Sequence, residues 1–334
     1  MSSAFFKFQK RGVSLKEEKK EQECTGFEAL YLAALDSDVS LIAGVPGYPI
    51  TSLMELFLRN SGKTELLEAL EAKDLVSSVV ASKPVQNYSA RWLTNEKVAL
   101  EIALGASVSG RRALVLVKHV GMNLLSDPLI TSVTHTIGAG LVIITGDDPG
   151  AKGSQNEQDS RWYGRIAEVA VFDPTDSDTA YRALRRAYGL SEETKTPVIL
   201  RVTAGLEGSK GMIKQLPESS PLHPEFDRSI WKSRMAEKHQ LFHSKTYPLL
   251  EKESENTDLN EIRKRTIEKA TGKAAEKKEQ TTENLQCSSD FRQGKIGIIS
   301  SGFVSSIVEE VLRKKKFHEQ AFWQIVGKKP SEQL

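Results

Sequence analysis

The segment Ala113-Leu114-Val115-Leu116-Val117 is apolar at every position and lacks the alternation of a strand with one solvent-exposed face. Similar runs recur at 141–144 (Leu-Val-Ile-Ile) and 198–200 (Val-Ile-Leu). Strands of this kind are buried on both faces, as in a parallel sheet that helices cover on both sides. The sequence therefore predicts an α/β fold in which helices connect parallel strands.

The rest of the chain is organised around these strands. We expect further strands at 39–43 and 75–80, and helices at 27–35, 53–59, 65–72 and from residue 95 onward. The pattern loosens after residue 202, and the Lys- and Glu-rich stretch that follows residue 250 has too few large apolar side chains for a core. The predicted division is an N-terminal extension (1–24), the α/β domain (25–210), a connecting segment (211–250), a charged flexible linker (251–293) and an incomplete strand–helix–strand unit (294–334).

The amino-acid composition excludes several classes of partner and cofactor. Lys and Arg number 46 and Asp and Glu 44, so the net charge of +2 gives no reason to expect a nucleic-acid or membrane partner. The two cysteines, Cys24 and Cys287, lie far apart, which excludes a CxxC zinc site or an iron–sulfur motif within this chain and favours a reducing compartment. No apolar run approaches the roughly 20 residues of a membrane span. We therefore expect a cytoplasmic protein.

The loop 44–51 (Gly-Val-Pro-Gly-Tyr-Pro-Ile-Thr) follows the first predicted strand. Ligands of open α/β sheets gather at the carboxyl ends of strands, where this loop is expected. Thr51 has two interpretations: its hydroxyl contacts a substrate, or it caps the next helix. The loop alone does not choose between them.

Glu96 is expected in the first turn of an Ala- and Gly-rich helix, with Asn95 as its N-cap. Apolar residues recur at helical spacing behind it, at Val98, Ala99, Ile102, Ala103 and Ala106. The plain interpretation is that Glu96 complements the helix dipole. The alternative is that an acid at this position faces a cofactor.

Two further loops carry groups with possible chemistry. His119 follows the 113–117 strand and is either an acid–base group or a hydrogen-bonded structural residue. Asp147 and Asp148 suggest a metal site, but Asp-Pro-Gly is also an ordinary turn and no third carboxylate stands at ligand spacing. We therefore expect no metal site here.

Five ordered blocks of sequence are similar to one known family. They are Pro46–Thr51, Asn95–Ser107, Val117–Asn123, Gly146–Gly150 and Ser154–Arg161. Together they resemble the pyrimidine-binding domain of the alpha subunit of indolepyruvate:ferredoxin oxidoreductase, a 2-oxoacid:ferredoxin oxidoreductase. The resemblance covers residues 25 to 210, and 297–302 is similar to the opening of that family's transketolase-C-like domain.

The resemblance implies a thiamin-diphosphate-binding fold and oxidative decarboxylation of an aryl 2-oxo acid to an acyl-CoA, with ferredoxin as electron acceptor. It gives Glu96 the role of the acid that hydrogen-bonds the aminopyrimidine ring, and Thr51 a place beside the substrate. The cofactor-binding residues that it implies are Gly47, Tyr48, Pro49, Glu96, His119, Gly121 and Asn123. The cofactor would be shared with a partner chain.

The diphosphate half of a thiamin site uses a Gly-Asp-Gly motif with an Asn some 25 to 30 residues later, and the resemblance implies that Mg²⁺ binds there. Here Gly146-Asp147-Asp148 is followed too soon by Asn156. We therefore expect the diphosphate domain, Mg²⁺ and iron–sulfur clusters on partner chains, among them the beta subunit, together with self-association. Half of a two-chain non-oxidative 2-oxo-acid decarboxylase and a non-catalytic truncated paralogue remain alternatives.

Overall fold

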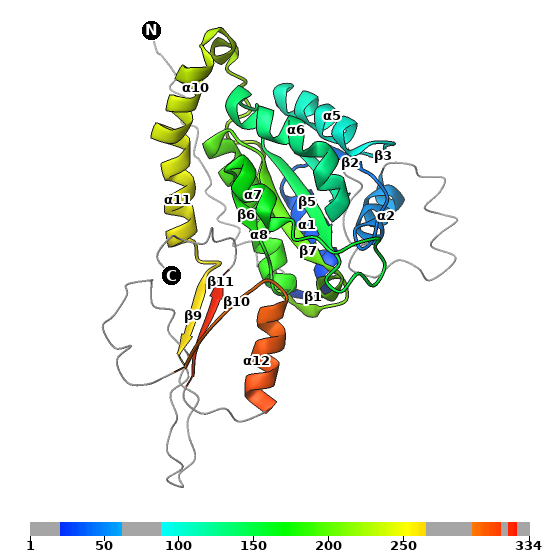
Figure 1. Ribbon diagram of the computed structural model, residues 1–334. Coiled ribbons are helices and arrows are strands. Elements are labelled where there is room, and N and C mark those ends of the chain that lie inside the picture. Colours follow the sequence, from blue (N-terminus) through cyan, green and yellow to red (C-terminus); the bar gives the residue numbers. More distant parts are fainter. Residues whose placement is uncertain (1–20, 62–87, 265–295, 315–319, 326–334) are drawn as a thin grey trace, which may run out of the picture.

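The computed structural model describes residues 21–61, 88–264, 296–314 and 320–325. Its centre is a six-stranded, all-parallel sheet in the order β3-β2-β4-β5-β7-β6 (Figure 1). The strands are β2 (Leu41–Gly44), β3 (Ser89–Trp92), β4 (Ala113–Lys118), β5 (Leu141–Asp147), β6 (Val171–Phe172) and β7 (Val198–Thr203). All residues of β5 and the first five of β4 and β7 are buried, which confirms the prediction from the apolar runs.

Helices cover both faces of this sheet. Their bounds are α1 (Gly26–Asp36), α2 (Thr51–Asn60), α5 (Glu96–Val108), α6 (His119–His135), α7 (Arg161–Ala167), α8 (Ser177–Thr194) and α9 (Ala204–Glu207). Helix α1 packs on α8, whereas α5 packs on α6 and α6 on α7. Right-handed crossovers that run in opposite directions along a sheet place their helices on opposite faces. The strand order therefore puts α5, α6 and α7 on one face and α8 with α1 on the other.

Several strands, among them β1, β3 and β8, lie where the sequence pattern predicted none. The edge strand β3 pairs with β2, and β1 (Glu21–Thr25) pairs antiparallel with β8 (Lys210–Lys214). The last residues of the predicted N-terminal extension thus belong to a sheet. The helix expected at 65–72 and the strand expected at 75–80 lie outside the described residues.

The connecting segment contains helices that extend beyond its predicted end. They are the short η1 (Arg228–Lys232), α10 (Met235–Leu241), the π-helical η2 (Phe242–Thr246) and α11 (Tyr247–Asn256). Helix α11 continues six residues into the segment that we expected to be a linker, and β9 (Glu261–Lys264) follows it. The linker prediction from residue 251 is therefore wrong for these residues, because Leu250 and Leu259 are buried and anchor the segment. Residues 265–293 of that linker are outside the described part.

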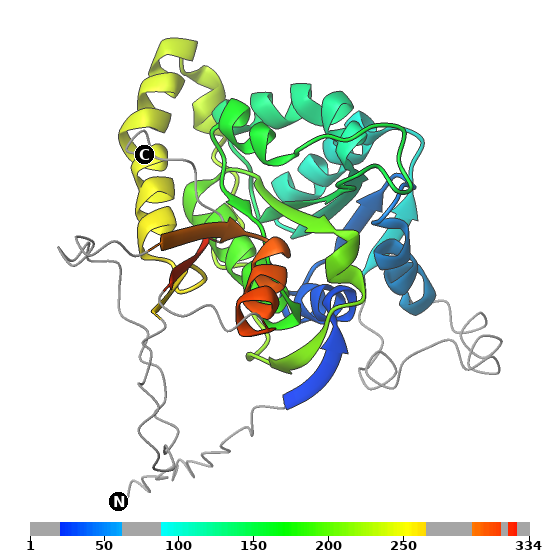
Figure 2. The same cartoon turned by 60° about the horizontal axis from the view of Figure 1, so that its bottom comes forward.

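The predicted strand–helix–strand unit is present. It consists of β10 (Ile296–Ser301), α12 (Val304–Lys314) and β11 (Gln320–Ile325), with β10 and β11 parallel and β9 added antiparallel to β11 (Figure 2). Arg161 donates to Ser301 Oγ over 2.6 Å, and Ser306 Oγ donates to the carbonyl of Thr175 over 3.1 Å. The turn after β10 therefore rests on the larger domain.

A buried ion pair fixes the amino end of the large sheet. Arg112 precedes β4, and its guanidinium donates to Glu192 through Nε (2.8 Å) and Nη2 (3.0 Å). Arg112 Nη1 also donates to the carbonyls of Ser37 and Ser219. The pair thus ties α1, α8 and the connecting segment to the start of the sheet. Among the described residues, no helix has both the length and the apolarity needed to cross a bilayer.

Candidate functional site

Three predicted loops meet at the carboxyl end of the large sheet. A Cβ placed on Gly47 would lie 2.6 Å from Lys118 Cδ, so the loop after β2 contacts the end of β4. A Cβ on Gly146 would lie 2.6 Å from Ile50 Cγ2 and 2.8 Å from Pro49 Cδ, so the same loop contacts the end of β5. These approaches are possible only because both residues lack a side chain. The structure therefore brings the loops 44–51, 118–123 and 146–161 together.

Glu96 is the first residue of α5, and Asn95 is its N-cap, as predicted. The Asn95 side chain accepts from the backbone N–H of Lys97 over 2.9 Å. Glu96 is only 8% exposed, and a Cβ on Gly121 of α6 would lie 2.9 Å from its carboxylate Oε1. Within the described part of the chain, the Glu96 carboxylate has no hydrogen bond or ion pair, and its oxygens still reach solvent. A nearly buried acid is thus held against a glycine with its oxygens uncommitted.

Thr51 is the first residue of α2 and does not cap it, because the residue at the N-cap position is Ile50. Its hydroxyl accepts from the Gly47 N–H over 2.9 Å and donates to the Gly47 carbonyl over 3.0 Å. Tyr48, which precedes the cis-peptide at Pro49, packs against Gly153 and is 37% exposed. In this arrangement Thr51 closes the loop on itself and leaves the Tyr48 ring at the surface.

His119 is fully buried, and both of its ring nitrogens have partners. Nδ1 lies 3.3 Å from the Gly146 carbonyl, and Nε2 lies 3.0 Å from the carbonyl and the side-chain oxygen of Asn156. The Gln158 side chain donates to the His119 carbonyl over 2.8 Å. These contacts match the structural interpretation of His119, since it joins the 146–161 loop to the start of α6. Asn123, also on α6, accepts from the Tyr163 hydroxyl.

Asp147 and Asp148 both have partners within the protein. Asp147 accepts from Arg201 Nε over 2.6 Å and from the Ser160 N–H over 3.0 Å. Burial acts to raise the pKa of Asp148, but hydrogen bonds from the loop, chiefly the Gly153 N–H at 2.7 Å, hold that pKa below its ordinary value. No group of three metal-ligating side chains occurs among the residues that the structure describes.

Sequence reasoning missed several residues of this region. Asn156, in the loop after β5, contacts His119, and Tyr163, on α7, contacts Asn123. Each partner is about 40 residues further along the chain, and nothing local marks it as a partner. Arg201 links Asp147 to Asp173, which it reaches through Nη1 over 3.1 Å. Its signal was an arginine inside an otherwise apolar strand, which requires a buried partner.

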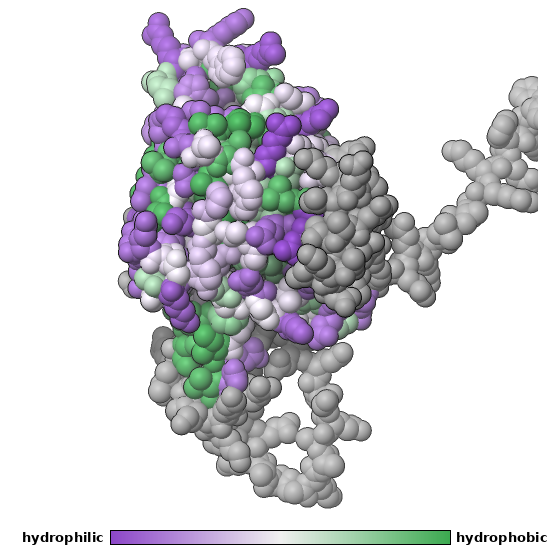
Figure 3. All heavy atoms as spheres, turned by 90° about the vertical axis from the view of Figure 1, so that its right-hand side faces the viewer, coloured by the Kyte–Doolittle hydropathy of each residue, from purple (hydrophilic) through white to green (hydrophobic). Residues whose placement is uncertain are grey.

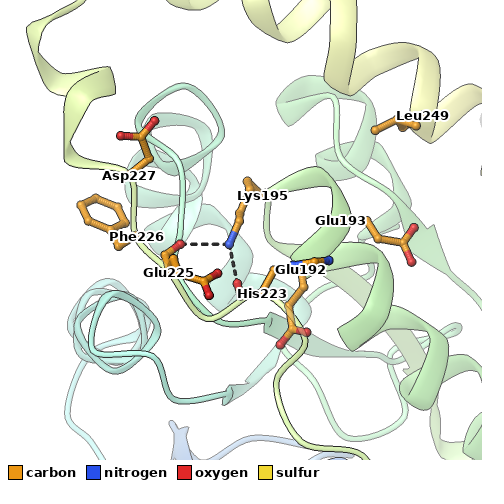
Figure 4. Close-up of a pocket in the computed structure, with 8 residues that line it drawn as sticks. All are labelled: Glu192, Glu193, Lys195, His223, Glu225, Phe226, Asp227 and Leu249. Carbon is orange, nitrogen blue, oxygen red and sulfur yellow. Dashed lines mark hydrogen bonds between the residues drawn. The ribbon is translucent and has the colours of Figure 1, made fainter.

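The larger of two cavities in the described part of the chain lies at the amino end of the sheet. It has a volume of about 580 Å³ and is lined by residues of α8, the connecting segment and α11 (Figure 4). There Lys195 donates to the backbone carbonyls of Gly138, His223 and Glu225, so its ammonium group holds the chain in place. A second cavity of about 430 Å³ lies between α5 and α6. We place the candidate site at Glu96 because of its uncommitted carboxylate, not because of cavity size.

Apart from Val108 in the last position of α5, four large apolar side chains of α5 and α6 are exposed. Val98 and Ile102 of α5 are 41% and 43% exposed, and Leu124 and Ile130 of α6 are 52% and 43% exposed. We call these four residues the α5–α6 face. Apolar surface is visible among polar residues on the side of the molecule that carries α2 and β3, beside α5 (Figure 3). Ala99 and Ala103, by contrast, are buried against the sheet.

The chain is similar in sequence to curated proteins named indolepyruvate oxidoreductase subunit IorA. The relative from Archaeoglobus fulgidus is 32% identical over 208 residues, which are 62% of this chain and 30% of that protein. The relative from Thermococcus kodakarensis is 36% identical over 195 residues, 58% of this chain and 27% of that protein. These relatives confirm the resemblance seen in the five blocks. The chain spans less than a third of their length, and no protein-family model matches it.

A solved structure supports the fold. It is that of 2-oxoglutarate:ferredoxin oxidoreductase from Magnetococcus marinus with 2-oxoglutarate, coenzyme A and succinyl-CoA bound. The TM-score is 0.59 at 14% identity, over 94% of this chain and 55% of that chain. At this identity the likeness concerns the fold alone, and it confirms the predicted α/β class.

Proposed function

We propose that this chain holds the aminopyrimidine of thiamin diphosphate in a 2-oxoacid:ferredoxin oxidoreductase that acts on an aryl 2-oxo acid such as indolepyruvate. The observation that carries the proposal is the Glu96 carboxylate, which is 8% exposed, lies against Gly121 and has no partner among the described residues. A carboxylate that is mostly shielded from solvent and has no protein partner can accept a hydrogen bond from a ligand, and that bond would offset part of its desolvation. The IorA relatives supply the chemical class.

The chemistry of Glu96 suits the pyrimidine ring. Gly121 lets the Glu96 carboxyl lie where the Cβ of any other residue would clash with it. A carboxyl group can share a proton with a ring nitrogen, which adjusts the basicity of the exocyclic nitrogen across the ring. When bound, thiamin diphosphate supplies the carbon nucleophile that attacks the keto carbon of a 2-oxo acid. Glu96 contributes the hydrogen bond to the ring nitrogen, which allows the exocyclic nitrogen of the pyrimidine to act as a base.

The remaining predicted residues have supporting roles in this proposal. His119 holds the 146–161 loop through both ring nitrogens, whereas Gly47, Pro49 and Tyr48 pack against Lys118, Gly146 and Gly153. Thr51 uses its one donor and one lone pair on Gly47, so in this state it shapes the loop. Direct contact of Thr51 with the substrate requires its hydroxyl to rotate away from Gly47, and that contact stays a prediction.

The proposed reaction needs partner chains. The α5–α6 face adjoins Glu96 and exposes four large apolar side chains, which is typical of an interface. We propose that a chain with the diphosphate and Mg²⁺ site docks there, and that iron–sulfur clusters on partners carry electrons to ferredoxin. Self-association and a cytoplasmic location stay predictions.

Purification of the tagged chain from its native source tests this function. We expect a co-purifying chain with a diphosphate-binding motif, and thiamin diphosphate, Mg²⁺ and iron in the complex. The complex should reduce ferredoxin when it is given indolepyruvate and coenzyme A. Decarboxylation without ferredoxin reduction would indicate the non-oxidative alternative. A monomer whose melting temperature does not respond to thiamin diphosphate would contradict the proposal.

A further inference from the structure

Lys118 is a partly buried cation beside the proposed cofactor site. It ends β4 and precedes the first turn of α6. The stem of its side chain packs over Gly47, where an added Cβ would lie 2.6 Å from Lys118 Cδ and 2.8 Å from Cγ. Across the described ranges of the chain, its ammonium group has no hydrogen bond or ion pair. Its stem is therefore fixed, and its charge is left for a ligand or for solvent.

The neighbours of Lys118 belong to the site. Gly47, on which it packs, exchanges two hydrogen bonds with the Thr51 hydroxyl. Gly121, three residues after Lys118, touches the Glu96 carboxylate. The first turn of α6 thus contacts the proposed cofactor acid through Gly121, and the residue before it contacts the proposed substrate loop through Gly47. No side chain caps α6, whose positive dipole end adds to the charge of Lys118.

We propose that Lys118 binds the carboxylate of the 2-oxo acid and so selects acids over neutral 2-oxo compounds. This inference rests on the proposed function. The diphosphate is assigned there to a partner chain and its Mg²⁺, so the anion that remains for this chain is the substrate carboxylate. A lysine is a compact charge on a flexible stem, which suits a small carboxylate. A hydrogen bond between two charged groups in a partly desolvated site is stronger than one between neutral groups.

The test compares Lys118→Met and Lys118→Arg with Lys252→Met in the purified complex. Lys252 is an exposed lysine of α11, so its substitution makes the same charge change away from the site. Indolepyruvate and its methyl ester are the probes, and thiamin diphosphate affinity is measured separately by fluorescence titration. We expect Lys118→Met to raise the KM for indolepyruvate about ten- to a hundred-fold. The KM for the ester and the affinity for thiamin diphosphate should each change less than about two-fold. The melting temperature should change by less than about 2 °C.

The outcomes separate this inference from the proposed function. Lys118→Arg should recover part of the lost affinity for the acid, and Lys252→Met should behave as the unchanged protein. Equal losses for acid and ester, or no loss for either with thiamin diphosphate still bound, would overturn the role of Lys118 alone. A complex of unchanged protein that binds no thiamin diphosphate would overturn the proposed function and this inference with it.

Discussion

The two ends of the parallel sheet differ in how their buried charges are satisfied. At the amino end, Glu192 accepts from Arg112, from the Gly140 N–H at 3.0 Å and from the Leu222 N–H at 2.7 Å. At the carboxyl end, Glu96 has no partner in the described part of the chain, although it is 8% exposed. The first arrangement stabilises a fold without a ligand. The second leaves a mostly shielded carboxylate open to a ligand.

This difference is a better guide to function than the size of a cavity. The cavity of about 580 Å³ lies at the amino end, where Lys195 and Glu192 are fully engaged with the protein. Large apolar pockets are the usual first hypothesis for a binding site. Here the buried charged groups at the amino end of the sheet are hydrogen-bonded within the protein, which indicates that this end stabilises the fold. Four predictions test this difference between the two ends.

The largest expected effect is on activity. Glu96→Gln should lower 2-oxo-acid-dependent ferredoxin reduction by the complex about 10²- to 10⁴-fold, because an amide cannot share a proton with the pyrimidine nitrogen. The melting temperature of the chain should change little, because the carboxylate has no partner in the described structure. Glu101→Gln, an exposed position on α5, is the control. Equal activity of the two variants would contradict the role of Glu96.

The next largest expected effect is on the stability of the fold, through the ion pair at the amino end of the sheet. Arg112→Met should lower the free energy of unfolding by about 3–5 kcal/mol, because it leaves the Glu192 carboxylate buried without its cation. Arg111→Met, at the exposed position next to it, should change that free energy by less than about 0.5 kcal/mol. Urea unfolding followed by circular dichroism measures both. A small effect of Arg112→Met would mean that the amino end is not the stabilising end.

A smaller effect is expected at Gly121. Gly121→Ala places a Cβ 2.7 Å from Glu96 Cγ, which should displace the acid and lower stability by about 1–3 kcal/mol. Gly105→Ala in α5 has open space around it and should be neutral or slightly stabilising, since alanine favours helix. Thiamin diphosphate titration of the complex should show weaker binding for the first variant alone. Similar binding by both variants would remove the geometric support for the site.

The smallest effect is the pH dependence of stability. Burial acts to raise the pKa of Glu192, but hydrogen bonds from Arg112 and from the backbone N–H of Leu222 hold that pKa below its ordinary value of 4.5. The stabilisation is therefore fully present above about pH 4.5 and is lost as the pH falls through the lower pKa of the folded state. Melting temperatures from pH 7 to pH 3 should show this loss, and Arg112→Met should reduce it. An unchanged pH profile in that variant would exclude this linkage.

Local sequence signals predicted the features that depend on neighbours in the chain. The cap at Asn95 and the first-turn position of Glu96 follow from residues within one helical turn, and the buried strands follow from runs such as 113–117. The five blocks added the resemblance to indolepyruvate:ferredoxin oxidoreductase, which the similarity to the IorA relatives confirms. These signals were enough for the fold class and for the position of Glu96 at the mouth of its helix.

Features that depend on distant residues were missed. The edge strand Ser89–Trp92 is short, partly exposed and contains an arginine, so it carries no apolar run. The partner of His119 is 37 residues away and the partner of Arg112 is 80 residues away. Strand β9 lies in a charged segment and is specified by pairing with β11. Such pairings are set by tertiary structure, which composition and periodicity do not report.

An experimental structure of the chain in its native complex with thiamin diphosphate tests the central claim most directly. We predict a carboxylate oxygen of Glu96 at about 3 Å from a pyrimidine ring nitrogen, with the ring beside Gly121. A Glu96 carboxylate that is paired with a cation of this chain or its partner, with the cofactor bound elsewhere, would contradict the account.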